Sequence, residues 1–336
     1  TRDHRVFEAG TNGQKMKVLI TGGAGFIGSH LAERHLSMGD EVDIIDNLST
    51  SDMTNVQHLE SHENCNCVID DILNVDVMRK LVSGCDLIYH LAAAVGVEYV
   101  LQNPLQTLTT NIRGTEIVLE LANEQKKRVV LLSTSEIYGK KNGHVPFRED
   151  SDRILGPTTV VRWSYSTTKA VDELLALAYW REKRLPTTIV RPFNVIGPRQ
   201  TGRYGMVVPR FIRQALLGDP ITVYDNGEQT RCWTYIDDAV DGLIALAQSD
   251  DAAGEILNLG SNFESSIKDL AIKIKAQTNS DSEIAFIPFS ETRRNGLYED
   301  LVYRAPDLEK IRGLVGYDPK VDLDEALRRI IEDFQK

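Results

Sequence analysis

Short runs of β-branched and aliphatic residues alternate with longer segments of helical periodicity over the first part of the chain. The segments whose apolar positions repeat with the period of a helix predict helices at 29–38, 75–82 and 107–125. The short apolar runs predict strands at 17–21, 41–46, 67–69, 87–90, 129–133 and 187–190. This alternation predicts an α/β fold, a parallel doubly wound sheet with helices on both faces.

The regular pattern loosens after about Pro192, where glycine and proline punctuate the chain. The later periodicity predicts a strand at 221–224 and helices at 211–217, 236–248, 267–278 and 323–334. We expect a first domain over 16–192, to which 236–262 returns, and a smaller α/β lobe over 193–336. Ligands of open α/β sheets bind at the carboxyl ends of the strands, so this lobe is expected to bind substrate there. Residues 1–15 are polar and are expected to form a flexible N-terminal arm.

Charge and the lack of long apolar runs narrow the classes of partner. The chain has 336 residues, with 38 Lys and Arg against 49 Asp and Glu, a formal net charge of −11. Such a balance argues against nucleic acid as a partner. No apolar run approaches the ~18 residues that cross a bilayer, and residues 1–15 lack the apolar core of a signal peptide. The four cysteines have neither disulfide nor zinc-site spacing, so we expect a cytoplasmic protein without membrane contact or bound metal.

A glycine-rich loop joins the first expected strand to the first expected helix. Gly22, Gly25 and Gly28 form a G-x-x-G-x-x-G motif in the strand–turn–helix context that dinucleotide binding requires. Gly22 permits the tight turn, Gly25 lets the backbone approach a pyrophosphate, and Gly28 allows close packing of the helix. The helix N-terminus, with Phe26 and Ile27, offers free N–H groups and a partial positive charge to phosphates. The motif predicts a Rossmann-type nucleotide-binding domain.

Acidic residues follow the next two expected strands. Asp46 closes the second strand, where a carboxylate hydrogen-bonds the ribose hydroxyls and repels a 2′-phosphate. With Asn47 beside it, this position predicts NAD rather than NADP as the cofactor. Asp71 and Ile72 follow the third strand and are expected at the adenine, with the neighbouring Asp70 as an alternative.

Tyr165 and Lys169 form a Y-x-x-x-K motif on an expected helix. Residues four apart share one helix face, so the phenol and the ammonium are expected to point into the same site. The nearby cation favours phenolate, which lets Tyr165 act as general base toward a substrate hydroxyl, and Lys169 is also expected at the nicotinamide ribose. Thr134 lies at the carboxyl end of an upstream strand, and it is expected to share a hydrogen bond with the same hydroxyl.

Together these motifs resemble one enzyme family. The segments that carry the resemblance are 21–28, 90–93, Asn111, 133–139, Tyr165 with Lys169, and 191–194. They are similar to the extended short-chain dehydrogenases/reductases, which include nucleotide-sugar epimerases, dehydratases and decarboxylases. The resemblance implies a bound NAD, a nucleotide-diphospho-sugar substrate and hydride abstraction at C4 of the sugar. It also places further residues at the cofactor: Leu91, Ala92, Ala93, Asn111, Ser133 and Pro192.

The same resemblance implies a homodimer. The helices at 98–124 and 165–183 of each subunit are expected to form a four-helix interface. The apolar positions on the second helix fit such an interface and fit equally well against the sheet: Leu174, Leu175, Leu177 and Ala178.

The residues around the expected base separate the branches of this family. Ser135 and Glu136, both expected in catalysis, resemble the pair found in UDP-glucuronate decarboxylases. The 4-epimerases usually carry a small residue in place of Glu136, and the 4,6-dehydratases usually carry Asp in place of Ser135. Four more residues lie in segments that resemble the decarboxylase branch: Tyr99, Arg162, Arg231 and Arg304. We expect a UDP-glucuronate decarboxylase, with a UDP-sugar 4-epimerase as the alternative and a 4,6-dehydratase or a non-catalytic NAD-binding protein as further ones.

The residues expected to handle the substrate follow from this chemistry. Oxidation at C4 turns a uronic acid into a β-keto acid, which loses CO₂ readily because the ketone accepts the electrons and gives UDP-xylose or the UDP-4-keto-pentose. The proton donor at C5 is expected to be Glu136, a water that it positions, or Arg231. Arg231 and Arg304 are expected to clamp the diphosphate. The remaining expected substrate contacts are Asn194 at the phosphate or sugar, Tyr224 at the uridine, Tyr99 at the sugar, and Arg162.

Overall fold

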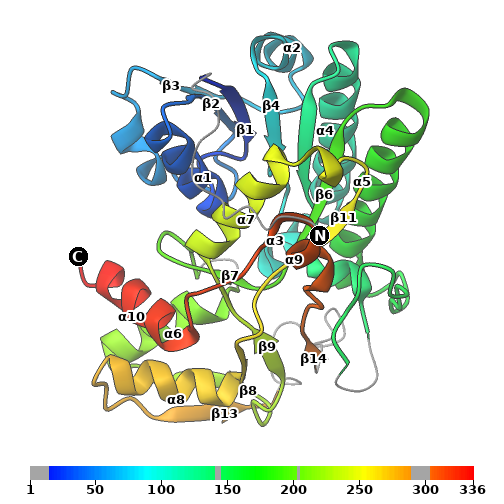
Figure 1. Ribbon diagram of the computed structural model, residues 1–336. Coiled ribbons are helices and arrows are strands. Elements are labelled where there is room, and N and C mark those ends of the chain that lie inside the picture. The colour runs from blue at the N-terminus through cyan, green and yellow to red at the C-terminus, as the bar shows by residue number, and fades with distance from the viewer. Residues whose placement is uncertain (1–14, 141–144, 203–204, 289–302) are drawn as a thin grey trace, which may run out of the picture.

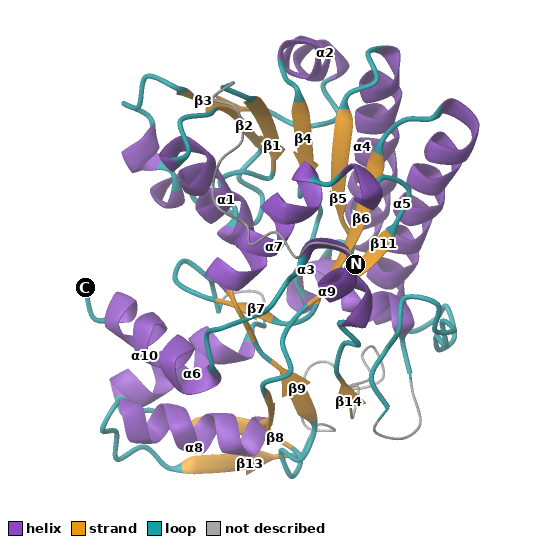
Figure 2. Cartoon of the chain, viewed as in Figure 1, coloured by secondary structure: helices purple, strands orange, loops and turns teal. Residues whose placement is uncertain are grey.

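The computed structural model describes residues 15–140, 145–202, 205–288 and 303–336 (Figures 1 and 2). The N-terminal arm expected over 1–15 lies almost wholly outside the described residues. Most of the described chain forms one large parallel sheet with helices on both faces, and the rest of it forms a smaller lobe that lies below the sheet in Figure 1.

Seven parallel strands form the main sheet, in the order β11-β6-β5-β4-β1-β2-β3. The strand order reverses between β1 and β4, which is where a doubly wound sheet opens a crevice at the carboxyl ends of its strands. The expected fold class is therefore confirmed. The strands are β1 (Lys17–Thr21), β2 (Glu41–Asp46), β3 (Cys65–Ile69), β4 (Leu87–His90), β5 (Arg128–Leu132), β6 (Thr187–Pro192) and β11 (Ile256–Leu259).

Two separate apolar cores hold the helices to the two faces of this sheet. Successive strand residues point to opposite faces, so Val18 and Ile20 belong to one core whereas Leu19 belongs to the other. Because both faces of the sheet are covered, the strand sequences are mostly continuous apolar runs and do not alternate between apolar and polar residues. The first core lies under α1 (Phe26–Ser37) and α7 (Ile236–Gln248), and the second lies under α2 (Val75–Gly84), α4 (Pro104–Glu124) and α5 (Arg162–Lys183).

The smaller lobe combines short strands with three amphipathic helices, α6 (Val207–Leu217), α8 (Ile267–Gln277) and α10 (Leu323–Phe334). In α10, Leu327 and Ile331 are buried while the exposed face carries ion-paired side chains, which is the pattern that predicted the helix. The short strands pair as β8 (Ile221–Tyr224) with β13 (Ile284–Ile287), β7 (Val195–Ile196) with β10 (Thr234–Tyr235), and β9 (Thr230–Cys232) between β12 (Glu264–Ser266) and β14 (Tyr303–Arg304).

Helix boundaries differ from the expected ones at two places that matter for the site. Helix α1 begins at Phe26 rather than at residue 29, so the glycine loop runs directly into its first turn. Helix α6 begins at Val207 rather than at residue 211, since Pro209 lies in its first turn, where a missing N–H costs no helical hydrogen bond. No helix among the described residues has the length and apolar character to span a membrane.

Candidate active site

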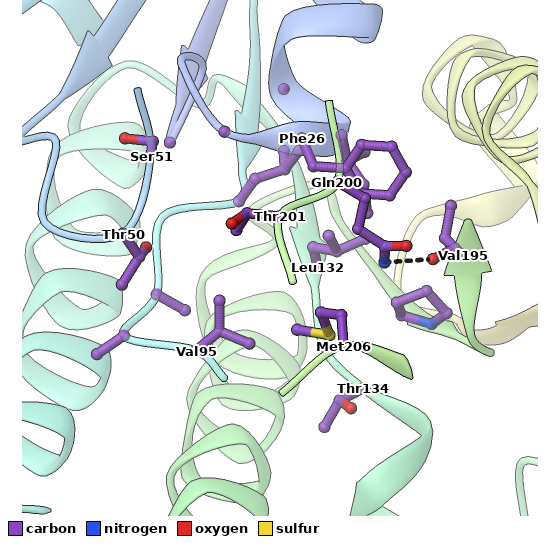
Figure 3. A pocket seen from close by; sticks show the side chains of 18 of the residues that line it. Phe26, Thr50, Ser51, Val95, Leu132, Thr134, Val195, Gln200, Thr201 and Met206 are labelled. Carbon is purple, nitrogen blue, oxygen red and sulfur yellow. Dashed lines mark hydrogen bonds between the residues drawn. The ribbon is translucent and has the colours of Figure 1, made fainter. Parts of the chain in front are cut away.

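A cavity of about 640 Å³ opens at the carboxyl ends of β1, β2, β4, β5 and β6. Its size is in the range of about 300–1,000 Å³ that small-molecule sites occupy. Residues of both the main sheet and the smaller lobe line it. Figure 3 shows Phe26 of α1, Thr134 after β5 and Met206 of the smaller lobe around the same space.

The glycine loop brings backbone, without side chains, to one wall of the cavity. Gly22 has a φ of +72°, and a Cβ on it would lie 2.8 Å from the backbone nitrogen of Ala92. A Cβ on Gly28 would overlap the carbonyl of Gly22. Within α1, which the structure describes in full, no side chain caps the N-terminus and the first turn carries no acidic residue. The free N–H groups and the positive end of the helix are therefore left for an anion such as a pyrophosphate.

Asp46 is fixed at the end of β2 by three donors. Its Oδ2 accepts from the N–H of Ala24 (3.1 Å), and its Oδ1 accepts from the N–H of Leu48 (2.8 Å) and from the hydroxyl of Ser51 (2.6 Å). The carboxylate and the neighbouring Asn47 both line the cavity. This anchored negative charge fits a ribose with free hydroxyls and opposes a phosphate at the same place.

The two adjacent acids after β3 occupy different places. Asp70 and Ile72 line the cavity, whereas Asp71 does not. Asp71 instead accepts hydrogen bonds from the side chain of Asn47 (2.8 Å) and from the N–H of Leu73 (2.9 Å). The geometry therefore favours Asp70 over Asp71 as a ligand contact.

The segment Leu91–Ala93 lines the cavity, and Asn111 holds the residue that follows it. Asn111 is buried behind the wall, where its Oδ1 accepts from the N–H of Ala94 (2.7 Å) and its amide donates to the hydroxyl of Thr168 (3.1 Å). Asn111 therefore positions this lining segment and ties it to α5 without lining the cavity itself.

Tyr165 and Lys169 lie one turn apart on α5, and both line the cavity. Burial raises the pKa of Tyr165, the charges of Glu136 and Asp172 raise it further, and a hydrogen bond with Thr134 opposes the shift. The ammonium of Lys169 lies 3.3 Å from Oδ2 of Asp172. The sequence led us to expect a phenolate favoured by Lys169; in the structure burial dominates, and the lysine is paired with a carboxylate of its own.

Beside the cavity, Ser133 joins a buried ion pair. Its hydroxyl donates to Oε1 of Glu173 (2.6 Å), and Arg191 donates to both oxygens of the same carboxylate (2.9 and 2.7 Å). The guanidinium of Arg191 lies over the ring of Tyr138. This cluster ties the ends of β5 and β6 to α5, and it fixes the backbone that presents Thr134, Ser135, Glu136 and Pro192 to the cavity.

Two arginines from separate strands meet on the opposite side of the cavity. Arg231 of β9 and Arg304 of β14 are register partners in a parallel pair, and both line the cavity. Arg304 Nη1 lies 3.5 Å from Oε1 of Glu136, and Nη2 donates to Oδ1 of Asn194. Asn194 in turn donates to the carbonyl of Cys232 (2.8 Å). The position expected to clamp a diphosphate is thus in contact with the carboxylate beside the expected base.

Tyr224 lines the cavity together with Arg210, which the sequence analysis missed. The guanidinium of Arg210 lies 4.7 Å from the centre of the Tyr224 ring and donates to its hydroxyl (2.9 Å). Further lining residues with polar or flexible side chains that were missed follow β2, such as Thr50, Ser51 and Asn55, and others come from the loop after β7: Arg199, Gln200, Thr201 and Met206. Figure 3 shows Gln200 donating to the carbonyl of Val195 (2.9 Å). The loop after β7 has no hydrophobic periodicity, and its glycines and prolines were the one signal in the sequence that marked it as a loop.

Two expected substrate contacts do not line the cavity. Tyr99 lies on α3 (Val97–Gln102), and Arg162 is the first residue of α5. Arg162 is buried, and its guanidinium lies 5.4 Å from the centre of the Trp163 ring. Arg162 stands three residues before Tyr165 on the same helix, and neither Arg162 nor Tyr99 is among the residues that line this cavity.

Comparison with known proteins identifies the family. The model of the family described as GDP-mannose 4,6 dehydratase matches residues 19–330. The chain belongs to this family. Its members are extended short-chain dehydrogenases/reductases, NAD-dependent enzymes that act on nucleotide sugars, and the family resemblance seen in the motifs is therefore confirmed.

Relatives in this family include two curated decarboxylases. A UDP-N-acetyl-alpha-D-glucosaminuronate decarboxylase of Bacillus cytotoxicus is 42% identical over 96% of this chain and 98% of its own length. UDP-glucuronic acid decarboxylase 1 of Xenopus tropicalis is 39% identical over 96% of this chain and 73% of its own. Among solved structures, UDP-glucuronic acid 4-epimerase of Bacillus cereus, in complex with UDP-glucuronic acid and NAD, superposes with a TM-score of 0.85 at 32% identity, covering 95% of this chain and 99% of that one.

Proposed function

We propose that this family member decarboxylates a UDP-linked uronic acid, using NAD. The observation that carries the proposal is the Glu136–Arg304 pair, which lies in the same cavity as Tyr165 and Lys169. A carboxylate and a guanidinium at the reacting end fit a reaction that removes a carboxylate and then needs a proton. Two decarboxylases of uronic acid nucleotides among the relatives support the assignment.

The cavity residues divide the reaction between them. Tyr165 accepts the proton of the sugar 4-hydroxyl, with Thr134 holding that hydroxyl in place. The glycine loop would hold NAD, which would supply the acceptor for the hydride of C4. The resulting β-keto acid loses CO₂ because the ketone accepts the electron pair of the breaking C–C bond, and Glu136 or a water that it positions delivers the proton to C5. Arg304 stabilises the negative charge that builds up during this step.

The other lining residues of the smaller lobe hold the nucleotide. Arg231 and Arg210 bind the diphosphate, for which planar guanidinium groups are well suited. Tyr224 packs near the uridine, and Asn194 orients the phosphate or sugar through its link to Arg304. The anchored Asp46 binds the adenosine ribose of NAD, and Asp70 and Ile72 lie near the adenine.

The decisive experiment offers the purified protein NAD with UDP-glucuronate in one reaction and with UDP-N-acetylglucosaminuronate in another. We expect release of CO₂ and a nucleotide sugar lighter by one CO₂ in the mass spectrum with at least one of them. The Tyr165→Phe variant serves as the matched control for contaminating activity. A product of unchanged mass but altered sugar configuration would refute decarboxylation.

That last outcome is the prediction of the second candidate, a UDP-sugar 4-epimerase. The 4-epimerase of Bacillus cereus supports it, because its fold matches almost the whole chain. Both reactions begin with the same oxidation at C4, and they differ in whether the C5 carboxylate survives. The mass of the product therefore separates them.

We further infer a cytoplasmic homodimer formed through α4 and α5, which pack together on one face of the sheet. On the outer surface of these helices, Leu105 is 77% exposed and Leu174 is 64% exposed, and Ala178 is exposed as well. Leu175 and Leu177 instead pack against the core. Light scattering should give twice the monomer mass, and Leu174→Glu should reduce it, whereas Leu217→Glu on α6 should not.

A further inference from the structure

Asp172 is a buried carboxylate on the active-site face of α5. Tyr165, Lys169 and Asp172 stand at helical positions i, i+4 and i+7, which lie above one another along the same face. Lys169 is 2% exposed and Asp172 is 0% exposed, and Lys169 Nζ lies 3.3 Å from Asp172 Oδ2. The aspartate does not line the cavity, so it can affect the reaction only through the residues that it faces, first among them the lysine.

An ionised carboxylate is costly to bury unless it is paired. Among the described residues, neither oxygen of Asp172 meets a donor with full hydrogen-bond geometry. Burial raises the pKa of Asp172, and the charge of Lys169 and, less strongly, the hydroxyl of Thr115 on α4 oppose that shift by favouring the ionised form. The ammonium and the carboxylate therefore depend on one another in a place that water does not reach.

Thr115 connects this ion pair to the segment after β4 that contains Ala92. Its hydroxyl oxygen lies 3.0 Å from Nε2 of His90, and Nδ1 of His90 lies 2.8 Å from the hydroxyl oxygen of Thr21. The hydroxyl of Thr21 also accepts from the N–H of Ala92 (3.2 Å), which lines the cavity.

The charge on Asp172 fixes which group donates and which accepts along this series of hydrogen bonds. If Thr115 donates to the carboxylate, its oxygen accepts from His90 Nε2–H. The pKa of His90 is lowered to about 3 by burial and by the charge of Lys169, so the ring is neutral and Nδ1 is an acceptor. Thr21 then donates to Nδ1, and its oxygen is left for the N–H of Ala92. A single anion thus sets the direction of every hydrogen bond up to the N–H of Ala92.

Other titratable groups also face this pair. Tyr165 and Glu173 lie on α5 itself, His90 comes from β4, and Glu136 comes from the η3 turn (Ser135–Tyr138). Glu173 is already neutralised by Arg191. The side chains that α4 adds, Thr115 and Asn111, do not titrate. Asp172 is accordingly the anion that meets the ammonium of Lys169 directly.

We propose that Asp172 is a positioning residue that keeps Lys169 protonated and pointed at the cofactor ribose. The proposal rests on the NAD site of the proposed function, and it does not depend on which sugar is converted. It assigns the buried aspartate the role of permanent counter-ion to the lysine of the Y-x-x-x-K motif.

The isosteric variant Asp172→Asn tests this role because it removes the charge and keeps the volume. An ammonium buried without a counter-charge gives up its proton at lower pH. Once neutral, Lys169 is a weaker donor to ribose hydroxyls. We expect the variant to bind NAD as the wild type does at about pH 6 and at least about tenfold more weakly at about pH 9, a difference that one unit of proton affinity accounts for.

The measurement is the dissociation constant of NAD for the cofactor-free protein, by titration calorimetry across this pH range. No sugar is present, so the test stands even if the product of the enzyme turns out to be an epimer. Glu173→Gln is the matched control: it removes a neighbouring buried carboxylate that pairs with Arg191, and we expect it to lower stability without a pH-dependent loss of NAD. An equal loss at every pH in Asp172→Asn, or no loss, would overturn the proposal.

Two further variants keep the test decisive if Asp172→Asn folds poorly. Thr115→Val leaves both charges in place but removes a hydroxyl that favours the ionised carboxylate, so Asp172 takes up a proton more readily. We expect its loss of NAD affinity to grow as the pH falls, the reverse of Asp172→Asn. In a Lys169→Met background, Asp172→Asn should change NAD affinity no further, because the two residues act as a unit. Additive losses, or a Thr115→Val protein indistinguishable from wild type at every pH, would count against Asp172.

Discussion

The carboxylate of Glu136 and the guanidinium of Arg304 lie 3.5 Å apart, although they are far apart in the sequence and come from different lobes. Glu136 follows the main sheet, while Arg304 is carried by a two-residue strand of the smaller lobe. The contact joins the two lobes at the place where the C5 carboxylate of a uronic acid is proposed to react.

Glu136→Gln should slow decarboxylation by about 10²- to 10³-fold, since the variant keeps the shape but loses the proton donor. Oxidation at C4 does not use this residue, so reduced cofactor should still form on mixing with UDP-glucuronate. Stopped-flow absorbance of the reduced nicotinamide and a CO₂ assay measure the two steps separately. Glu255→Gln, in an exposed pair with Lys310, is the control. Equal losses in both steps would contradict the assignment of Glu136 to the second one.

Tyr165→Phe should reduce turnover by about 10²- to 10⁴-fold, because the variant has no group to accept the proton of the 4-hydroxyl. The affinity for the UDP-sugar should change little, since the rest of the cavity is unaltered. Steady-state kinetics and calorimetric binding of the substrate measure the two effects. A variant that turns over near the wild-type rate would exclude Tyr165 as the base.

The protonation of the Tyr165 phenol should also limit turnover at low pH. Burial raises the pKa of Tyr165 in the cofactor-free structure. Because the base must be deprotonated to accept a proton, turnover should rise with pH on the acidic limb of the profile. Bound NAD brings a positive nicotinamide ring, which should favour the phenolate. We therefore expect the phenol to titrate at lower pH in the NAD complex than in the cofactor-free protein, as ultraviolet difference spectra of the tyrosinate would show.

Asp46→Asn should weaken the preference for NAD over NADP by about tenfold, the size of a single electrostatic contribution of about 1.4 kcal/mol. The amide keeps an oxygen for the donors of Leu48 and Ser51, whereas the bond from the N–H of Ala24 to the other carboxylate oxygen is lost. Binding constants for both cofactors give the ratio. An unchanged ratio would show that Asp46 has only the structural role of anchoring the glycine loop.

His90 should make the protein less stable in acid. Burial and the charge of Lys169 lower its pKa from the ordinary 6.5 to about 3, so between these pH values the unfolded chain binds a proton that the folded protein does not. The free energy of unfolding should therefore fall as the pH drops from about 6.5 toward 3. His90→Gln should flatten that fall, which urea titrations at several pH values would reveal. Burial lowers the pKa of His35 as well, so part of the acid sensitivity should persist.

The strands of the main sheet were predictable because both of their faces are buried, and the helices beside it because each buries one apolar stripe. Strand β1 matches its expected range, and helix α7 does as well, since their apolar periodicity is set by the core on which they pack. The glycine loop was predictable for a different reason: few residues other than glycine tolerate the backbone of Gly22. Local rules of this kind act over a few residues and can be read from the sequence.

The parts of the site that were missed depend on contacts between distant segments. Nothing in the sequence places Arg304 beside Glu136, because β9 and β14 are too short to have a period and are paired only in three dimensions. Arg199 and Arg210 come from a loop and a helix start without a motif. Asp172 did have a signal: it stands three residues after Lys169 on the same helix face, where a buried acid needs a partner.

Strand β11 completes the main sheet only after the chain has passed through much of the smaller lobe. It pairs with β6 along its whole length, and the N–H of Phe193 then donates to the carbonyl of Leu259 (2.8 Å). During synthesis on the ribosome, β6 must therefore wait as an open edge, and such edges are prone to aggregate. A fragment that stops at Pro192 would keep that edge exposed and would also lack α7 over one face. The segment up to Pro192 is thus not an independent folding unit. Chimaeras with related enzymes should exchange it together with the chain through β11.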